Sequence, residues 1–425
     1  MKKIATVTLT VIFTVFLFIS CGDEPTPTPP GPTVISVEGV QLKESTTILE
    51  HESETLVATV LPANAANKKV SWSSDKTDIA TVDETGKVTG IKAGEATITV
   101  TTEDGGKTAS CKVTVKTNAK YIPLTLEFPE AGKVTITKIG NPGELLYSIN
   151  DGANQLVDDY KLVNGIDISA NQTISFYRTL SSDLTNYDYY AINCDKECYV
   201  YGNVMSLIDP NNFATATSVP EFAFAKLFSN NDNIKNHKSL DLVLPATELN
   251  YACYYSMFLN CDNLTKAPAL PATTLAISCY QQMFYGCTSL TTAPALPAET
   301  LVYGCYMSMF NVCTSLTTAP DLPATTLAEA CYYGMFAGCT SLETAPVLPA
   351  PTLAMSCYYS MFEGCSSLNS ITCLATDISA PNCTDWWVDG VATPGTFTKA
   401  STADWGVPGS SKIPSGWTVQ NYPTP

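Results

Sequence analysis

The strongest constraint on the fold is an internal repeat of 26 residues in the C-terminal half of the chain. Each unit carries two cysteines eight residues apart, and one copy reads CYQQMFYGCTSLTTAPALPAETL. A catalytic pair is needed once, whereas a packing position is needed in every unit of a stack. The repeat therefore predicts a stacked architecture, built around the pairs Cys253/Cys261, Cys279/Cys287, Cys305/Cys313, Cys331/Cys339 and Cys357/Cys365.

The spacing of these cysteines argues against a disulfide, a metal site and a redox pair. In a short helix over residues 279–287, Cys279, Met283 and Cys287 share one face. The two cysteine Cα atoms would lie about 12 Å apart, beyond the roughly 7 Å that a disulfide can span. Structural zinc sites favour cysteines about two to four residues apart, and free buried cysteines pack as small hydrophobic groups. We therefore expect two ladders of buried thiols, with no metal and no other cofactor.

The second half of each unit predicts a short strand followed by a proline turn. In SLTTAPALP, Leu290 and Ala293 match inward positions, Thr291 and Thr292 lie between them, and Pro294 turns the chain. Units would stack through strands at about 4.8 Å but through helices at about twice that distance, so the stack should curve. We expect a curved α+β solenoid of about eight units over residues 198–425, closed by the degenerate unit CTDWWVDGV.

The words MFYGCTSL and ALP of one unit, with close variants in the others, resemble the repeat of the BspA-like bacterial leucine-rich-repeat surface proteins. The period here is longer, and the leading cysteine is additional. The resemblance implies a leucine-rich-repeat solenoid and attachment to proteins of a host or a neighbouring cell.

Two smaller β regions are expected before the repeats. Alternating apolar residues in ATITV and turn glycines predict a half-buried sheet. The words WSSD, ATV, GKVTG and AGEATITV resemble the bacterial immunoglobulin-like group 2 domain over residues 34–117, which implies an all-β sandwich. Residues 120–197 alternate again, in KVTITKI and TISFYRT, and predict a second small β domain. Disulfides at Cys194–Cys198 and Cys373–Cys383 remain open at this point.

The N-terminus, residues 1–21, resembles a lipoprotein signal peptide. Lys2 and Lys3 precede an apolar run that ends shortly before Cys21. The resemblance implies cleavage and lipidation at Cys21, with an uncleaved anchor as the alternative. Residues 22–33 are Pro-rich and predict a semi-rigid tether. Its opening Gly-Asp-Glu resembles the signal that sends some lipoproteins to the outer face, so we expect an outer-membrane protein that is lipid-anchored and faces the exterior.

Composition and charge exclude several functions. The chain has two histidines, His51 and His237, far apart in the sequence, so no His-based triad or metal site is expected. The carboxylates of the repeats occupy non-equivalent places, which argues against a paired acid/base site. A net charge of −17 opposes binding of nucleic acid. We expect a protein that is not an enzyme and touches the membrane through its lipid anchor alone.

Two rows of side chains are candidate binding surfaces. The first is a hydroxyl-rich strip on the predicted strand face: Thr265, Lys266, Thr291, Thr292, Thr317, Thr318, Glu343 and Thr344. The second is the row of tyrosines that follow each leading cysteine, for which packing between units is the favoured alternative: Tyr254, Tyr280, Tyr306, Tyr332 and Tyr358.

The leading interpretation is an adhesion or recognition protein that presents a curved repeat array to an extracellular protein. The alternatives are a glycan-capture lipoprotein of a polysaccharide uptake system and a structural coat component. The ligand and the oligomeric state are not predicted.

Overall fold

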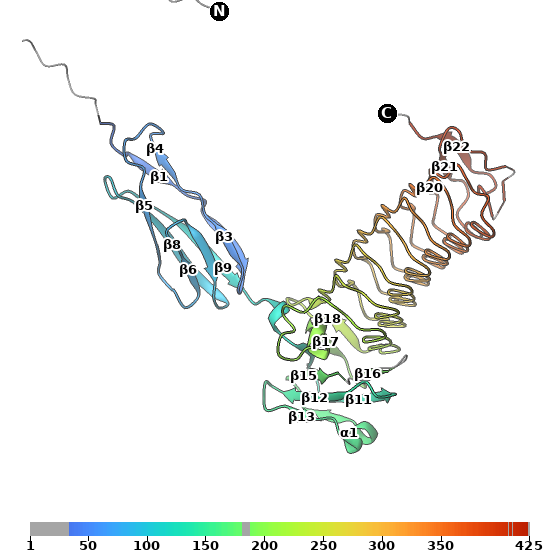
Figure 1. Cartoon of the computed structure of the whole chain (residues 1–425), viewed down its shortest axis with the longest axis horizontal. Helices are drawn as coiled ribbons and strands as arrows, with labels where there is room; N and C mark the ends of the chain where they lie inside the picture. The colour runs from blue at the N-terminus through green and yellow to red at the C-terminus, as the bar shows by residue number, and fades with distance from the viewer. Residues whose placement is uncertain (1–33, 181–187, 407, 410, 424–425) are drawn as a thin grey trace, which may run out of the picture. The chain divides into compact units, whose positions relative to one another are not determined.

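The computed structural model describes residues 34–180, 188–406, 408–409 and 411–423. The predicted signal peptide with Cys21 and the predicted tether lie outside these described residues. Contacts divide the chain into an N-terminal unit that ends at Lys116 and a C-terminal unit that begins at Thr117 (Figure 1).

The N-terminal unit is all β, as predicted, and consists of two main sheets around one core and a strand pair with a smaller cluster of its own. The buried residues alternate along β8, where Ala96, Ile98 and Val100 point inward. Side chains from both main sheets meet in one hydrophobic cluster, which makes the unit a sandwich. The first sheet has the order β2(Ser45–Leu49), β9(Thr108–Lys116), β8(Gly94–Thr102), β5(Val70–Ser74); the second is β3(Ser53–Thr55), β7(Lys87–Gly90), β6(Ala80–Val82); the pair is β1(Gly39–Gln41), β4(Thr59–Leu61).

The C-terminal unit begins with a β region that continues directly into the repeats. Strand β17 pairs antiparallel with β10 on one side and parallel with β18 on the other. The predicted boundary between residues 197 and 198 therefore falls inside one sheet, and a single core runs from Leu124 to Trp417. The sheet contains β13(Gln155–Leu156), β12(Glu144–Ile149), β15(Gln172–Thr179), β10(Leu124–Phe128), β17(Cys198–Asn203), β18(Ile234–Asn236) and β19(Leu242–Val243); a second sheet contains β14(Ile166–Ile168), β11(Gly132–Ile139) and β16(Tyr189–Cys194); η1(Ala119–Tyr121), α1(Asp159–Asn164) and η2(Val204–Leu207) complete the region.

From Cys198 onward the repeat units stack side by side and form the repeat array, with a regular spacing of 26 residues from Cys253 to Cys383 (Figure 1). Parallel bridges join equivalent residues of successive units, for example Lys266 to Thr292 and Thr344 to Ser370. At the far end the bridges lengthen into a parallel sheet of β20(Ser370–Cys373), β21(Thr396–Lys399) and β22(Thr418–Asn421).

The helix predicted between the two cysteines of each unit is wrong. The described part of the chain has one α-helix, the six-residue α1, and it lies outside the array. Each cysteine-to-cysteine segment is instead a turn ribbon, in which alternate N–H groups bond in two directions. The N–H of Met257 donates to Tyr254 O within the unit (3.2 Å), whereas the N–H of Phe258 donates to Met283 O of the next unit (2.9 Å). A helix would use all of these groups internally, so the ribbon gains lateral bonds that a helix cannot make.

The turn ribbon nevertheless buries the predicted residues. Its backbone returns to positive φ every fourth residue, at Ala252, Ser256 and Asn260 (φ 51°, 51° and 55°). Every fourth side chain therefore faces the same way, as in a helix, and Cys279, Met283 and Cys287 are all fully buried, as predicted. Successive rings of the phenylalanine ladder, such as Phe258 and Phe284, lie 5.5 Å apart, well below the 8–10 Å expected of packed helices. The predicted curvature assumed that helices space the units farther apart than strands do, and this assumption does not hold for the turn ribbon.

No helix within the described ranges is long and apolar enough to cross a bilayer.

Candidate binding surfaces

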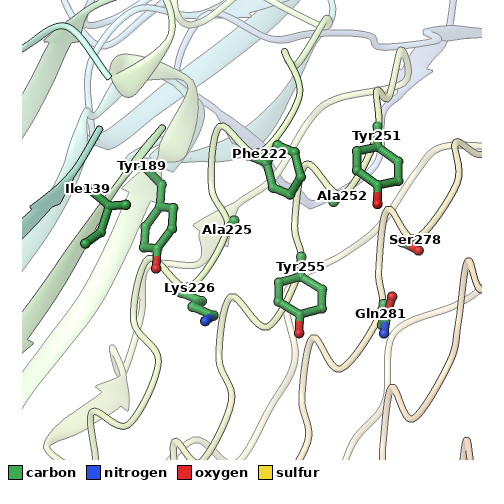
Figure 2. A pocket seen from close by; sticks show the side chains of 10 residues that line it. All are labelled: Ile139, Tyr189, Phe222, Ala225, Lys226, Tyr251, Ala252, Tyr255, Ser278 and Gln281. Carbon is green, nitrogen blue, oxygen red and sulfur yellow. The ribbon is translucent and has the colours of Figure 1, made fainter. Parts of the chain in front are cut away.

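A cavity of about 440 Å³ lies where the β region meets the first repeat units (Figure 2). Four aromatic rings line it: in the view of Figure 2, Tyr189 and Tyr251 lie on opposite sides, with Phe222 and Tyr255 between them. Phe222 is 3% exposed and meets Tyr251 edge to face, with ring centroids 5.2 Å apart. Sequence reasoning missed this aromatic cavity, because its walls come from β11, β16 and three separate loops.

The hydroxyl-rich strip is exposed along the array, as predicted. All eight residues are exposed: Thr265, Lys266, Thr291, Thr292, Thr317, Thr318, Glu343 and Thr344. Parallel bridges lie at both ends of the strip, at Lys266–Thr292 and Thr344–Ser370. At the first of them, Thr291 N and Thr291 Oγ1 both donate to Thr265 O (3.0 and 3.1 Å). The backbone of the strip is thus bonded to a neighbouring unit at each end, while binding of a ligand there stays a prediction. We refer to these eight residues as the threonine strip.

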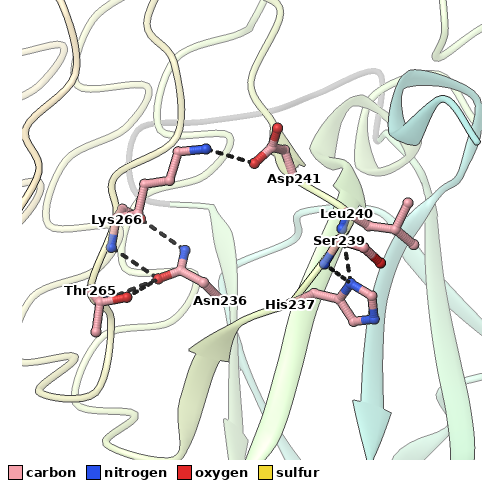
Figure 3. Close-up of polar contacts among 7 residues, drawn as sticks. All are labelled: Asn236, His237, Ser239, Leu240, Asp241, Thr265 and Lys266. Carbon is pink, nitrogen blue, oxygen red and sulfur yellow. Dashed lines mark hydrogen bonds and ion pairs between the residues drawn. The ribbon is translucent and has the colours of Figure 1, made fainter. Parts of the chain in front are cut away.

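The first unit of the threonine strip is fastened by one asparagine of β18 (Figure 3). Asn236 Oδ1 accepts bonds from the N–H groups of Thr265 (3.0 Å) and Lys266 (2.9 Å), and its Nδ2 donates to Lys266 O (2.9 Å). The side-chain amide therefore takes the place of a neighbouring strand's peptide group. The ammonium of Lys266 pairs with Asp241 at 2.9 Å across an exposed surface, which contributes little to stability.

The side chain of His237 accepts hydrogen bonds from the backbone of the adjacent loop (Figure 3). Its Nδ1 accepts bonds from the N–H groups of Ser239 (3.2 Å) and Leu240 (2.9 Å), and its Nε2 lies 3.2 Å from the Glu127 carboxylate. With Nδ1 occupied as an acceptor, the imidazole orders this loop at the start of the strip.

A groove of about 400 Å³ runs beside the threonine strip. Lys266 and Thr292 form one edge, and the floor is built from apolar side chains that include Leu264, Pro268 and Pro294. An apolar floor with a hydroxyl-rich rim can bury the side chains of an extended segment while its backbone bonds the rim.

The tyrosine row is not a surface. Tyr254, Tyr280, Tyr306, Tyr332 and Tyr358 are each at most 2% exposed. Successive rings stack with centroids 5.6–6.1 Å apart. Burial raises the pKa of these phenols above the ordinary value. These residues, named as candidate ligand contacts from the sequence, are out of reach of a ligand, and the packing alternative is correct.

The ladder thiols are buried, and the second cysteine of each unit has a bonding role as well. Cys287 Sγ donates to Phe258 O of the preceding unit at 3.1 Å, and burial raises the pKa of its thiol to about 12. The same bond recurs from Cys261, Cys313, Cys339 and Cys365.

The two disulfides left open by the sequence are absent, since Cys194, Cys198, Cys373 and Cys383 are free thiols. Cys194 Sγ and Cys198 Sγ lie 3.3 Å apart as a hydrogen-bonded pair. Among the residues that the structure describes, no group of three or more His, Cys, Asp or Glu side chains could hold a metal ion.

Residues 36–113 match the bacterial Ig-like domain (group 2). The same region is 45% identical over 86 residues to an alpha-L-arabinofuranosidase of Bifidobacterium longum, which is 20% of this chain and 8% of that protein. It is 49% identical over 84 residues to an Ig-like virion protein of Serratia phage KSP90, which is 19% of this chain and 33% of that protein. An uncharacterized protein of Bacillus cereus is 37% identical over 98 residues, which are 21% of this chain and 74% of that protein.

These matches define a protein with a bacterial Ig-like module joined to a second, larger unit. The chain belongs to the proteins that carry a bacterial Ig-like domain (group 2), and this assignment concerns residues 36–113. The chain spans less than a tenth of the arabinofuranosidase and a third of the virion protein.

Proposed function

We propose that the chain is a lipid-anchored recognition protein of the cell surface, whose repeat array binds an extracellular protein. The observation that carries this proposal is the threonine strip, eight exposed side chains at equivalent positions of four successive units. The apolar groove beside the strip supplies the buried contact area that a hydroxyl row alone lacks. An extended segment of a partner protein fits this combination.

The remaining parts of the chain fit presentation of this surface away from a membrane. Lipidation at Cys21, followed by the Pro-rich residues 22–33, would anchor and space the chain. Ig-like domains of similar sequence occur in an arabinofuranosidase and in a virion protein. A domain that occurs in such different proteins fits the role of a spacer, so we assign recognition to the repeat array. We take this array to be of the BspA-like leucine-rich-repeat type, although its described cysteine-to-cysteine segments are turn ribbons and not helices.

The test introduces positive charge into the strip at exposed positions, where the fold should tolerate it. The variant Thr291→Lys with Thr292→Lys places two cations on an acidic chain at exposed positions. We expect about tenfold weaker binding to whichever protein of an extracellular-matrix panel the native chain binds. The matched control is Thr273→Lys with Thr274→Lys, the same change at exposed threonines outside the strip.

Surface plasmon resonance measures the affinities, and circular dichroism the melting temperatures. Equal affinity of the strip variant and the control, with both folded, would contradict the assignment of binding to the threonine strip. The second candidate function is capture of glycans, which the aromatic cavity favours.

A further inference from the structure

We propose that the aromatic cavity binds one sugar ring of an oligosaccharide, independently of any protein bound at the threonine strip. Its volume, about 440 Å³, lies within the range of small-ligand sites. The cavity combines aromatic walls with hydrogen-bonding groups that approach from different sides. Carbohydrates present the same combination, because a pyranose has apolar C–H faces and a rim of hydroxyl groups.

The aromatic side of the cavity is preformed. Phe222, Ala225 and Ala252 make a small buried cluster that is separate from the main core. Tyr255 and Tyr189 pack against this cluster, which fixes the positions of their rings. The Tyr251 ring contacts Phe222 edge to face but remains 40% exposed. A sugar face stacked on these rings would cover the exposed aromatic surface at little conformational cost.

The polar side narrows the ligand class. Lys226, Gln281 and Ser278 line the cavity together with the tyrosine hydroxyls, and none of the described lining residues carries a carboxylate. The Lys226 ammonium lies 5.9 Å from the Tyr255 ring, and the Gln281 amide nitrogen donates to Met307 Sδ at 3.3 Å. Lys226 would repel a cationic ligand, and a purely apolar ligand would leave these groups unpaired. A neutral sugar or a uronic acid satisfies both conditions.

The sequence of the repeat restricts this tyrosine pair to one of the cysteine-paired units. Among the five cysteine-paired units, the positions of Tyr251 and Tyr255 are both tyrosine in the first alone. The later units carry other pairs at these positions: Ile277/Gln281, Tyr303/Met307, Glu329/Tyr333 and Met355/Tyr359. Tyr189 and Ile139 of the β region also line the cavity, and among the described residues this region adjoins the first end of the array.

The experiment measures binding of the full chain to a defined panel of glycans. The probes are cello-, malto-, manno- and xylo-oligosaccharides together with oligogalacturonates, tested by calorimetry and by saturation-transfer NMR. We expect at least one probe to bind, and Tyr251→Ala and Tyr255→Ala each to weaken it by about tenfold. Lys226→Gln should weaken the oligogalacturonates more than the neutral probes.

Matched controls separate the cavity from general exposure of aromatic side chains. Tyr303→Ala and Tyr333→Ala change tyrosines at the equivalent positions of later units and should bind as the native chain does. Thr291→Lys with Thr292→Lys should also leave glycan binding unchanged, so this proposal and the protein-recognition proposal can fail separately. The inference is overturned if the native chain binds none of the probes, if folded Tyr251→Ala and Tyr255→Ala variants bind normally, or if the controls lose binding equally.

Discussion

At the scale of single residues, the ladder thiols do more than fill space. The carbonyl of Phe258 accepts two bonds, one from the N–H of Cys261 in its own unit and one from the thiol of Cys287 in the next. A buried carbonyl oxygen has two lone pairs, and the S–H group of the cysteine is long enough to reach the second one and donate to it. This contact explains why cysteine, rather than alanine or valine, fits the second ladder position.

The raised thiol pKa values predict that the C-terminal unit loses stability in alkali. A thiol in the unfolded chain ionises near the ordinary value of 9.0, whereas burial holds the pKa of Cys287, Cys305 and Cys365 at about 12. The unfolded state therefore binds fewer protons above pH 9, so the free energy of unfolding falls as pH rises and is unaffected below it. Each such thiol contributes up to about 1.4 kcal/mol per pH unit in this window.

Melting curves of the full chain between pH 7 and pH 11 measure this loss. The control variant, Cys287→Ala with Cys365→Ala, should start from a lower melting temperature at neutral pH and show a shallower decline. Rapid labelling of Cys287 by a thiol reagent in the native state near pH 8 would contradict the prediction, because a buried, protonated thiol should not react.

At the scale of the element, the turn ribbon depends on residues that tolerate positive φ. The last such position in each ribbon is Asn260, Gly286, Gly338 or Gly364 in four units. The remaining unit places Val312 there, with φ 60° and 36% exposure. A β-branched residue is strained in this region of backbone conformation, so this unit carries a local cost that its neighbours avoid.

Val312→Gly should stabilise the C-terminal unit. Release of left-handed strain is worth about 1–2 kcal/mol, and the extra freedom of glycine in the unfolded chain offsets about 0.5–1 kcal/mol. We expect a net gain of about 1 kcal/mol, measured by urea denaturation. The control is Val347→Gly, an exposed valine of the same array without positive φ, which should lose stability. A loss in both variants would mean that Val312 is not strained.

At the scale of the whole molecule, the chain consists of two units rather than three. The β region and the repeat array share a sheet through β17 and a common core. The β region thereby covers the first end of the array, where the apolar interior of a stack would otherwise face water. The N-terminal unit has its own core around Ile98 and Val113.

This arrangement predicts two independent unfolding transitions in calorimetry. Met283→Ala empties a fully buried position and should cost about 2–5 kcal/mol in the transition of the C-terminal unit alone. Phe176→Ala, in the β region, should lower that same transition, because the two parts share one core. Ile98→Ala is the reciprocal control and should lower the other transition only. A third transition, moved by Phe176→Ala but not by Met283→Ala, would show that the β region folds as a separate domain.

The sequence by itself determined the unit length, the inward residues Cys279, Met283 and Cys287, the exposed threonine strip and the β-sandwich. The sandwich was implied by the resemblance to the bacterial Ig-like domain, and the other features follow from periodicity, because alternation and repetition show which side chains avoid water. Periodicity did not separate a helix from a turn ribbon, since both return every fourth side chain to the same face. That choice depends on whether N–H groups bond within a unit or to its neighbour, which only stacking decides. The burial of the row that begins at Tyr254, and the aromatic cavity with walls from residues 139 to 281, are likewise products of tertiary structure, because they arise between chain segments that no local pattern relates.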